Sequence, residues 1–242
     1  MDYQDVLAAV GAGSAHPGAF RSTEEWMGEL LITREHHVLD VGCGTGRTPV
    51  ELARRFGCKI TGIDVRPAMI RKAKKRSGIL GVKGTWLVAD ARSLPFANNS
   101  FDFVITESVN VFADADAALA EYYRVLKPSG TYVDVEMMIL GPVAPGFHET
   151  ARTVYGARQV PDLRGWKQRY RSAGFEEIRV VSTRPVRPQE VMSDGNPDDV
   201  VLSDKDAYHR PEVLQVLRQN AEWLDQYHSS LGYGIFLCQK GN

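Results

Sequence analysis

The sequence predicts an α/β fold built on a mainly parallel β-sheet, and three consecutive features of the chain predict it. Residues 38–41 form a short apolar strand that runs directly into a glycine-rich turn. Residues 47–57 read as a helix, with apolar residues on one side and Gly57 as a stop signal. Residues 59–65 form a second apolar strand that carries Asp64 near its end. Strand, helix and strand in this order make one βαβ unit.

The turn after the first strand has the composition of a ligand-binding loop. Gly42, Gly44 and Gly46 stand at alternate positions, and Asp40 precedes them. Glycine lets the backbone turn sharply and bring its amides close to a ligand. A dinucleotide fingerprint would have its third glycine one residue later, where Arg47 stands. Asp64, about 20 residues beyond the turn, is placed to accept hydrogen bonds from a ribose diol, although a strand-end turn residue is the simpler interpretation of Asp64 alone.

Several further segments carry a resemblance to one enzyme family. Residues 38–46, VLDVGCGTG, closely resemble the first motif of the class I S-adenosylmethionine (SAM)-dependent methyltransferases. The resemblance continues through residues 89–96 (ADARSLPF), the strand at 100–107, the helix and turn at 119–130, and the strand at 131–136. One departure is Ser129, which replaces a glycine in a turn. The pattern is nearest to the methyltransferase type 11 branch, which modifies quinones, sterols and other small molecules.

The resemblance implies a fold, a cofactor and an activity. The fold would be a doubly wound, Rossmann-like sheet of seven strands in the order 3-2-1-4-5-7-6, with strand 7 antiparallel, and a helical cap. The activity would be transfer of a methyl group from SAM to a small-molecule acceptor by in-line displacement, releasing S-adenosyl-L-homocysteine. The cofactor-binding residues implied are Asp40, Gly42, Cys43, Gly44, Gly46, Asp64 (ribose), Val65, Met69, Asp90 and Ala91 (adenine), and Glu107.

Four residues are candidates for catalysis. Glu107 follows the fourth strand, beside the expected position of the methyl group, and is predicted either to act as a base or to position the ligands. His16 lies in an HPG segment similar to the HPGG segment of several small-molecule methyltransferases, and a loop-ordering role is the alternative. His148 and Tyr155 follow the fifth strand. Other residues expected to face the methyl group are Thr106, Ser108, Asn110, Phe112, Glu136 and Met137.

The chain is expected to form a single domain with two decorations. Residues 1–33 are predicted as a helical lid, in which Ser22 or Thr23 caps a helix that reaches Leu31. Residues 34–182 would form the Rossmann-like core and residues 232–242 the final strand. Residues 183–231 would be an insertion between the last two strands, with a loop at 185–199 and a helix at 211–231, and it would extend the cap over the strand ends. Trp223 is expected to belong to the packing core of that helix.

Composition limits the partners. The 242 residues contain 29 Lys and Arg against 30 Asp and Glu, so the basic footprint of a nucleic-acid-binding protein is missing. The basic run at 71–76 is predicted as a solvated helix face. The three cysteines lack metal-ligand spacing, so no metal site is expected. With no signal peptide and no long apolar run, the protein is expected to be cytoplasmic, without membrane insertion, and a monomer or homodimer.

Two other functions stay open at this stage. One is a protein or RNA methyltransferase, which the neutral charge disfavours. The absence of an Asn/Asp-Pro-Pro-Tyr motif at residues 106–109, which read TESV, disfavours it too. The other is a non-catalytic SAM-binding or sensing module, which would retain the same cofactor motifs.

Overall fold

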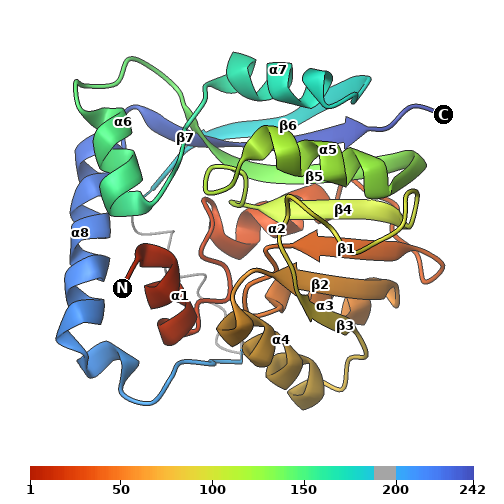
Figure 1. The fold of residues 1–242 in the computed structure, drawn as a ribbon, viewed down its shortest axis with the longest axis horizontal. Helices are drawn as coiled ribbons and strands as arrows, with labels where there is room; N and C mark the ends of the chain where they lie inside the picture. Colours follow the sequence, from red (N-terminus) through yellow and green to blue (C-terminus); the bar gives the residue numbers. More distant parts are fainter. Residues whose placement is uncertain (188–199) are drawn as a thin grey trace.

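The computed structural model describes residues 1–187 and 200–242, and a seven-stranded sheet forms its centre (Figure 1). The strand order is β3-β2-β1-β4-β5-β7-β6, which confirms the predicted order. β7 is antiparallel to both β5 and β6, and the remaining neighbours are parallel. The strands are β1 (His37–Val41), β2 (Lys59–Asp64), β3 (Thr85–Val88), β4 (Phe101–Glu107), β5 (Leu126–Ile139), β6 (Glu177–Pro185) and β7 (Leu231–Gln239).

Helices pack on the sheet in two groups. α3 and α4 pack against each other and against β2, whereas α5 and α7 pack against each other and against β5 and β6 respectively. None of the described helices is long and apolar enough to cross a membrane. The helices are α1 (Tyr3–Val10), α2 (Ala19–Met27), α3 (Arg47–Phe56), α4 (Pro67–Ile79), α5 (Ala115–Val125), α6 (Phe147–Thr150), the π-helix η1 (Ala151–Tyr155), α7 (Leu163–Ser172), the 3₁₀-helix η3 (Ala207–His209) and α8 (Pro211–Tyr227).

The central strands are apolar on both faces because both faces are covered. Val38 and Leu39 of β1 are fully buried, as are Val104 and Ile105 of β4. On β2, Gly62 is required by packing, since a Cβ there would lie 2.5 Å from the Trp86 ring of β3. This packing fixes the strand ends that carry the site.

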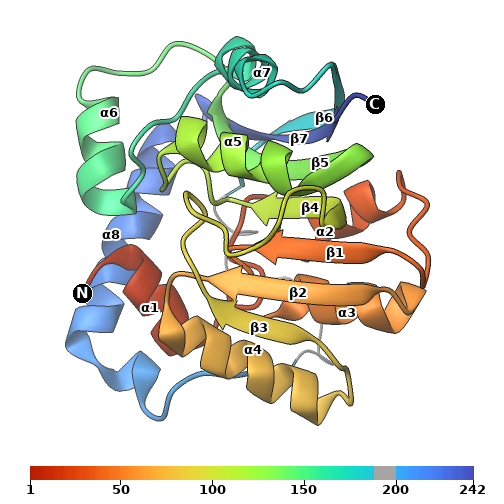
Figure 2. The same cartoon turned by 45° about the vertical axis from the view of Figure 1, so that its right-hand side comes forward.

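α1, α6 and α8 lie beyond the carboxyl ends of the parallel strands (Figures 1 and 2). α1 packs against α8, and both come from segments predicted as lid and cap. The Tyr155 ring of η1 stacks on Trp223 of α8, with centroids 5.2 Å apart and planes 11° apart. Trp223 is buried, so its predicted packing role is confirmed.

Three local expectations were wrong. α2 begins at Ala19, after Gly18 in a left-handed conformation (φ 80°), so neither Ser22 nor Thr23 caps it. Both hydroxyl residues are buried inside the helix, where they donate to other groups. α2 also ends at Met27 rather than reaching Leu31, with Gly28 as its C-cap. α8 ends at Tyr227, and β7 already begins at Leu231. Of the predicted loop at 185–199, residues 188–199 lie outside the described part of the chain.

The basic run at 71–76 is only in part the solvated face predicted for it, since Arg71, Lys74 and Lys75 are exposed but Lys72 and Arg76 are not. The Arg76 side chain is buried and donates hydrogen bonds to the carbonyl of Thr45, in the glycine turn, and to the carbonyl of Val200. Lys72 donates to the carbonyl of Ala8 in α1 and pairs with Asp204. Two of the cations therefore tie the lid and the cap segment to the core.

Candidate active site

Two adjoining cavities lie at the carboxyl ends of β1, β2 and β4. The larger, about 270 Å³, is named here the Asp90 cavity, and the smaller, about 90 Å³, the His16 cavity. Each is named for a residue that lines only that cavity. They share the lining residues Gln4, Gly42, Asp64, Met69 and Ser108. A ligand that passes the glycine turn and Asp64 would therefore reach into both.

The glycine turn has the backbone conformation that only glycine adopts without strain. Gly42, Gly44 and Gly46 have φ values of 71°, 51° and 80°. A Cβ on Gly42 would lie 2.5 Å from Cγ2 of Val109, whereas a Cβ on Gly44 would meet no protein atom within 4 Å. Gly46 lines neither cavity; a Cβ there would lie 2.8 Å from Cβ of Ala73. Gly42 and Gly44 therefore form part of a cavity wall, whereas Gly46 allows the start of α3 to approach α4 closely.

Arg47, at the position of the missing dinucleotide glycine, is a buried link to the lid. Its Nη1 donates to Oγ of Ser14 at 3.1 Å, and its guanidinium carbon lies 4.1 Å from the centre of the Phe20 ring. α3 therefore begins with a side chain that holds residues 14–20 over the core.

Asp64 ends β2 with its carboxylate directed by two backbone amides. Its Oδ2 accepts from the N–H of Gly44 at 3.1 Å, and its Oδ1 accepts from the N–H of Arg66 at 2.8 Å. Burial raises the pKa of Asp64, against the lowering effect of these two bonds. The Arg66 side chain reaches the opposite way and pairs with Asp2 and Asp5 of the lid.

Asp40 is a buried carboxyl in the wall of the His16 cavity. Burial, followed by repulsion from Glu107 and Asp64, raises the pKa of Asp40 well above its usual range. Three acidic residues, Asp40, Asp64 and Glu107, line this one small cavity. Their common field favours a cationic ligand.

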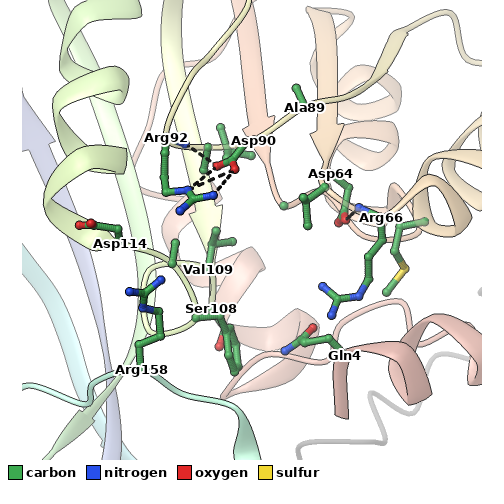
Figure 3. Close-up of a pocket in the computed structure, with 17 residues that line it drawn as sticks. Gln4, Asp64, Arg66, Ala89, Asp90, Arg92, Ser108, Val109, Asp114 and Arg158 are labelled. Atoms are coloured by element: carbon green, nitrogen blue, oxygen red, sulfur yellow. Dashed lines mark hydrogen bonds and ion pairs between the residues drawn. The ribbon is translucent and has the colours of Figure 1, made fainter. Parts of the chain in front are cut away.

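Asp90 follows β3 at the rim of its cavity and forms a two-pronged ion pair with Arg92 (Figure 3). The Arg92 Nε lies 3.0 Å from Oδ1 and the Nη2 lies 2.6 Å from Oδ2. Hydrogen bonding to Arg92 lowers the pKa of Asp90. Val65, Met69 and Ala91 line the same cavity beside it.

The Glu107 carboxylate accepts hydrogen bonds from side chains of two helices. Its Oε1 accepts from Oγ1 of Thr23 at 2.7 Å and from Nε1 of Trp26 at 3.0 Å, and its Oε2 accepts from Oγ1 of Thr48 at 2.6 Å. The Nε2 of His16 lies 3.6 Å from Oε2. One carboxylate thus joins β4, α2, α3 and the His16 loop.

Comparisons with known proteins identify the family. Residues 38–130 match a family model described as a methyltransferase domain. The chain is 33% identical to the O-methyltransferase resE of Aspergillus sclerotiorum, over 77% of this chain and 78% of the relative. The chain belongs to the class I SAM-dependent methyltransferases.

Two further similarities extend over nearly the whole chain. This methyltransferase is 28% identical to the uncharacterized methyltransferase YodH of Bacillus subtilis, over 98% of this chain and 99% of the relative. Its fold is shared by phosphoethanolamine N-methyltransferase 2 of Haemonchus contortus in complex with SAM. The TM-score of that match is 0.76 at 20% identity, covering 98% of this chain and 57% of the other. The methyl donor is SAM.

The cavities of this methyltransferase fit that donor chemically. SAM has a positive sulfonium and a positive ammonium group, and the His16 cavity presents three acidic residues and no basic residue other than His16. Gly42 and Gly44 supply a wall without side chains. The residues of the Asp90 cavity include the acid after β2 and the acid after β3, as the family resemblance implied.

The three other candidate catalytic residues lie in different surroundings. His16 is buried and lines its cavity, with Nδ1 3.3 Å from Oγ of Ser22. Tyr155 is buried among Tyr3, Phe112 and Trp223 and lines neither cavity, and burial raises the pKa of its hydroxyl well above the usual range. His148 is exposed on α6 and also lines neither cavity.

Glu136 does not face the cavities as expected. It is fully buried, and its Oε2 accepts hydrogen bonds from the backbone amides of residues 109, 110 and 111. Thr106 and Asn110 are likewise internal, since both donate to Asp134 on β5. These side chains shape the loop after β4, which carries Ser108 and Phe112 to the cavity wall. The signal missed in the sequence was the pair of acids, Asp134 and Glu136, in the buried apolar second half of β5.

Gln4, Arg66, Asp114 and Arg158 also line the Asp90 cavity and were not foreseen. Gln4 and Arg158 come from segments that follow no motif, so only the packing of α1 and η1 brings them there.

Proposed function

We propose that this methyltransferase transfers the methyl group of SAM to a small organic acceptor held between the strand ends, α1 and the segment after η1. The observation that carries the proposal is the grouping of Asp40, Asp64 and Glu107 around the glycine turn in one cavity, which adjoins a second cavity walled by Gln4 of α1 and Arg158 after η1. An enclosed site of this kind favours a small molecule over a macromolecular surface. The name of the nematode protein above, a phosphoethanolamine N-methyltransferase, agrees with that class.

The proposed donor contacts follow from the placement of the side chains. Asp64 would accept from the ribose hydroxyls, and Asp90 and Ala91 would contact the adenine. Gly42, Cys43, Gly44 and Asp40 would surround the methionine portion, with Val65 and Met69 as apolar walls. When bound, SAM supplies a methyl group on a cationic sulfur, which is already electrophilic.

The chain's own contribution would then be positioning and exclusion of water. Holding the acceptor in line with the methyl group makes the reaction effectively unimolecular. Glu107 is a poor general base, because both of its oxygens already accept hydrogen bonds. We assign it a positioning role: it holds α2 and His16 in place. His16, whose imidazole lines the same cavity, is the candidate base for an acceptor that must lose a proton.

The lid would close this site. α1 is held to the core by the ion pairs of Arg66 with Asp2 and Asp5, by Lys72 and by the packing of buried residues such as Leu7. On this proposal residues 1–33, 183–187 and 200–231 order around the bound ligands and exclude water from the reacting groups.

The test is incubation of the purified protein with methyl-labelled SAM and fractionated cell extract. We expect the label in one small organic product, formed with an equal amount of unlabelled S-adenosylhomocysteine, and less product with the Asp64→Ala variant when SAM is not saturating. Label in protein or RNA would support a macromolecular methyltransferase instead. SAM binding without any labelled product would support the sensing module.

A further inference from the structure

The polar side chains that line the Asp90 cavity fall into two groups. In the first group each side chain is already matched: Arg92 pairs with Asp90, Arg66 pairs with Asp2 and Asp5, and Asp64 and Asp114 accept from backbone amides. In the second group no side-chain hydrogen bond or ion pair is completed within residues 1–187 and 200–242. That group consists of Gln4, Ser108 and Arg158.

Arg158 is the charged member of the unmatched group. It follows η1, and its backbone N–H donates to the carbonyl of Val111 at 2.7 Å, which docks its loop on the segment after β4. Its guanidinium lies at the end of the cavity that also carries Ser108 (Figure 3). The carboxylate of Asp114 points away from the centre of the cavity in the same view and caps α5 through the N–H of Ala117. This end of the cavity therefore carries a guanidinium that completes no ion pair within residues 1–187 and 200–242, with the Asp114 carboxylate on the same wall.

Ser108 adds a buried hydroxyl in a strained position. Its φ of 58° is left-handed, which is uncommon for a residue other than glycine and is concentrated at functional sites. The Tyr155 hydroxyl is its neighbour, and this contact partly offsets the raising of the Tyr155 pKa by burial, but its geometry falls short of a hydrogen bond. A buried polar atom without a partner requires an explanation, and a bound ligand is one.

Val109 and an aromatic ring form the apolar part of the same wall. The Phe112 ring lies beside Tyr155, with centroids 5.2 Å apart and planes 41° apart, and Phe112 and Val109 both line the cavity. An aromatic face of this kind favours a planar partner, which can stack on it.

We propose that the acceptor is a planar, aromatic or conjugated organic acid, whose carboxylate pairs with Arg158 and hydrogen-bonds to Ser108 while its ring packs on Phe112. Arginine suits this role because its planar fork matches the two oxygens of a carboxylate. Gln4 would complete the enclosure from α1, so that acceptor binding and lid closure are coupled. The inference rests on the proposed function, and it assigns Arg158 and Ser108 as specificity-determining residues.

The experiment measures acceptor binding without turnover. The protein is saturated with S-adenosylhomocysteine and titrated calorimetrically with pairs of aromatic acids and their neutral carboxamides, such as benzoate and benzamide, 4-hydroxybenzoate and its amide, and cinnamate and its amide. We expect at least one acid to bind about tenfold more tightly than its amide, as one charge-assisted hydrogen-bonded pair implies. This preference should weaken in high salt, because Arg158 is exposed.

Variants test whether Arg158 causes the preference for the acid over the amide. Arg158→Gln should abolish the difference between acid and amide and leave the affinity for S-adenosylhomocysteine unchanged. Arg158→Lys should retain part of it. Arg34→Gln, which removes an exposed arginine that lines neither cavity, should behave like the wild type.

Equal affinity for acid and amide across the panel, binding of neither, or an undiminished preference in Arg158→Gln would overturn the inference while leaving the proposed function intact. Failure of the wild-type protein to bind S-adenosylhomocysteine would instead overturn the proposed function, and this inference with it.

Discussion

The indole Nε1 of Trp26 donates a 3.0 Å hydrogen bond to Oε1 of Glu107, a residue 81 positions later in the chain. Through this bond the lid helix α2 is fastened to the end of β4. The same carboxylate accepts from Thr23 and Thr48, so the lid, the helix after the glycine turn and the fourth strand meet at one acidic side chain.

Replacing Glu107 by Gln should therefore act mainly on stability. The carboxamide of Gln keeps one oxygen acceptor, but its N–H₂ group would face hydroxyl or indole groups that donate hydrogen bonds in the wild type. Two donors would then face each other, so we expect a loss of about 1–3 kcal/mol in the free energy of unfolding. Urea denaturation followed by fluorescence measures it. Glu29→Gln, which breaks an exposed ion pair with Arg179, is the matched control and should change stability by less than about 0.5 kcal/mol.

A variant as stable as the wild type whose rate constant falls by about 10²–10⁴ at unchanged SAM affinity would contradict the positioning role and restore Glu107 as a base.

Binding of SAM should release a proton from Asp40. Burial and the two neighbouring acids raise the pKa of Asp40 in the ligand-free protein, and a cationic ligand favours the ionised carboxylate, so the pKa falls on binding. SAM affinity should consequently rise with pH over the range between the bound and free pKa values. Calorimetry in buffers of different ionisation enthalpy measures the released proton. Asp40→Asn should reduce the release, and uptake of protons by the wild type would contradict this electrostatic description.

Stability should depend on pH through Asp134. Burial raises the pKa of Asp134 from 3.8 to about 6, so the folded state binds a proton that the unfolded state has already lost in this interval. The stabilising effect is complete below the unfolded pKa and is lost as pH rises through the folded one. The free energy of unfolding of the wild type should thus fall from about pH 4 to pH 6 relative to that of Asp134→Asn. A parallel pH dependence in the two proteins would show that Asp134 does not titrate in this way.

Alanine variants of two glycines distinguish the loss of a ligand contact from the cost of backbone strain. Gly44 and Gly81 have φ values of 51° and 66°, and a Cβ on either would meet no protein atom within 4 Å. Replacement by Ala should cost each about 1 kcal/mol of stability or somewhat more, because the left-handed backbone is strained for alanine. Only Gly44→Ala should weaken SAM binding, since Gly44 lines the His16 cavity and Gly81 does not. Equal SAM affinities of the two variants would remove the glycine turn from the site.

The fold was predictable because its determinants are local or carried by motifs. The βαβ unit indicated a parallel sheet, and the resemblance over residues 38–136 implied the strand order that the structure shows. Buried strands of a parallel sheet are marked by continuous apolar runs, which are legible without knowledge of the partners.

Less of the site could be predicted, because its chemistry depends on long-range contacts. Nothing near Glu107 in the sequence indicates that Thr23, Trp26 and Thr48 would bind it. Arg76 was assigned to solvent from its basic neighbours, whereas the fold buries it against the glycine turn. Glu136 was predicted to face the site because of its position in the fifth strand. The loop after β4 instead folds over it, and its carboxylate accepts hydrogen bonds from backbone amides of that loop. In each case tertiary packing decides which atoms a polar side chain meets.

The central claim is that SAM lies across the glycine turn with its ribose on Asp64, and calorimetric titration of SAM into the wild type and Asp64→Ala tests it most directly. The buried carboxylate should provide hydrogen bonds worth roughly 1.5–3 kcal/mol each, so the variant should bind SAM about 10 to 100 times more weakly while remaining folded. NAD should not bind to either protein, because Arg47 occupies the position of the dinucleotide glycine. A folded Asp64→Ala variant with wild-type affinity for SAM would contradict the account.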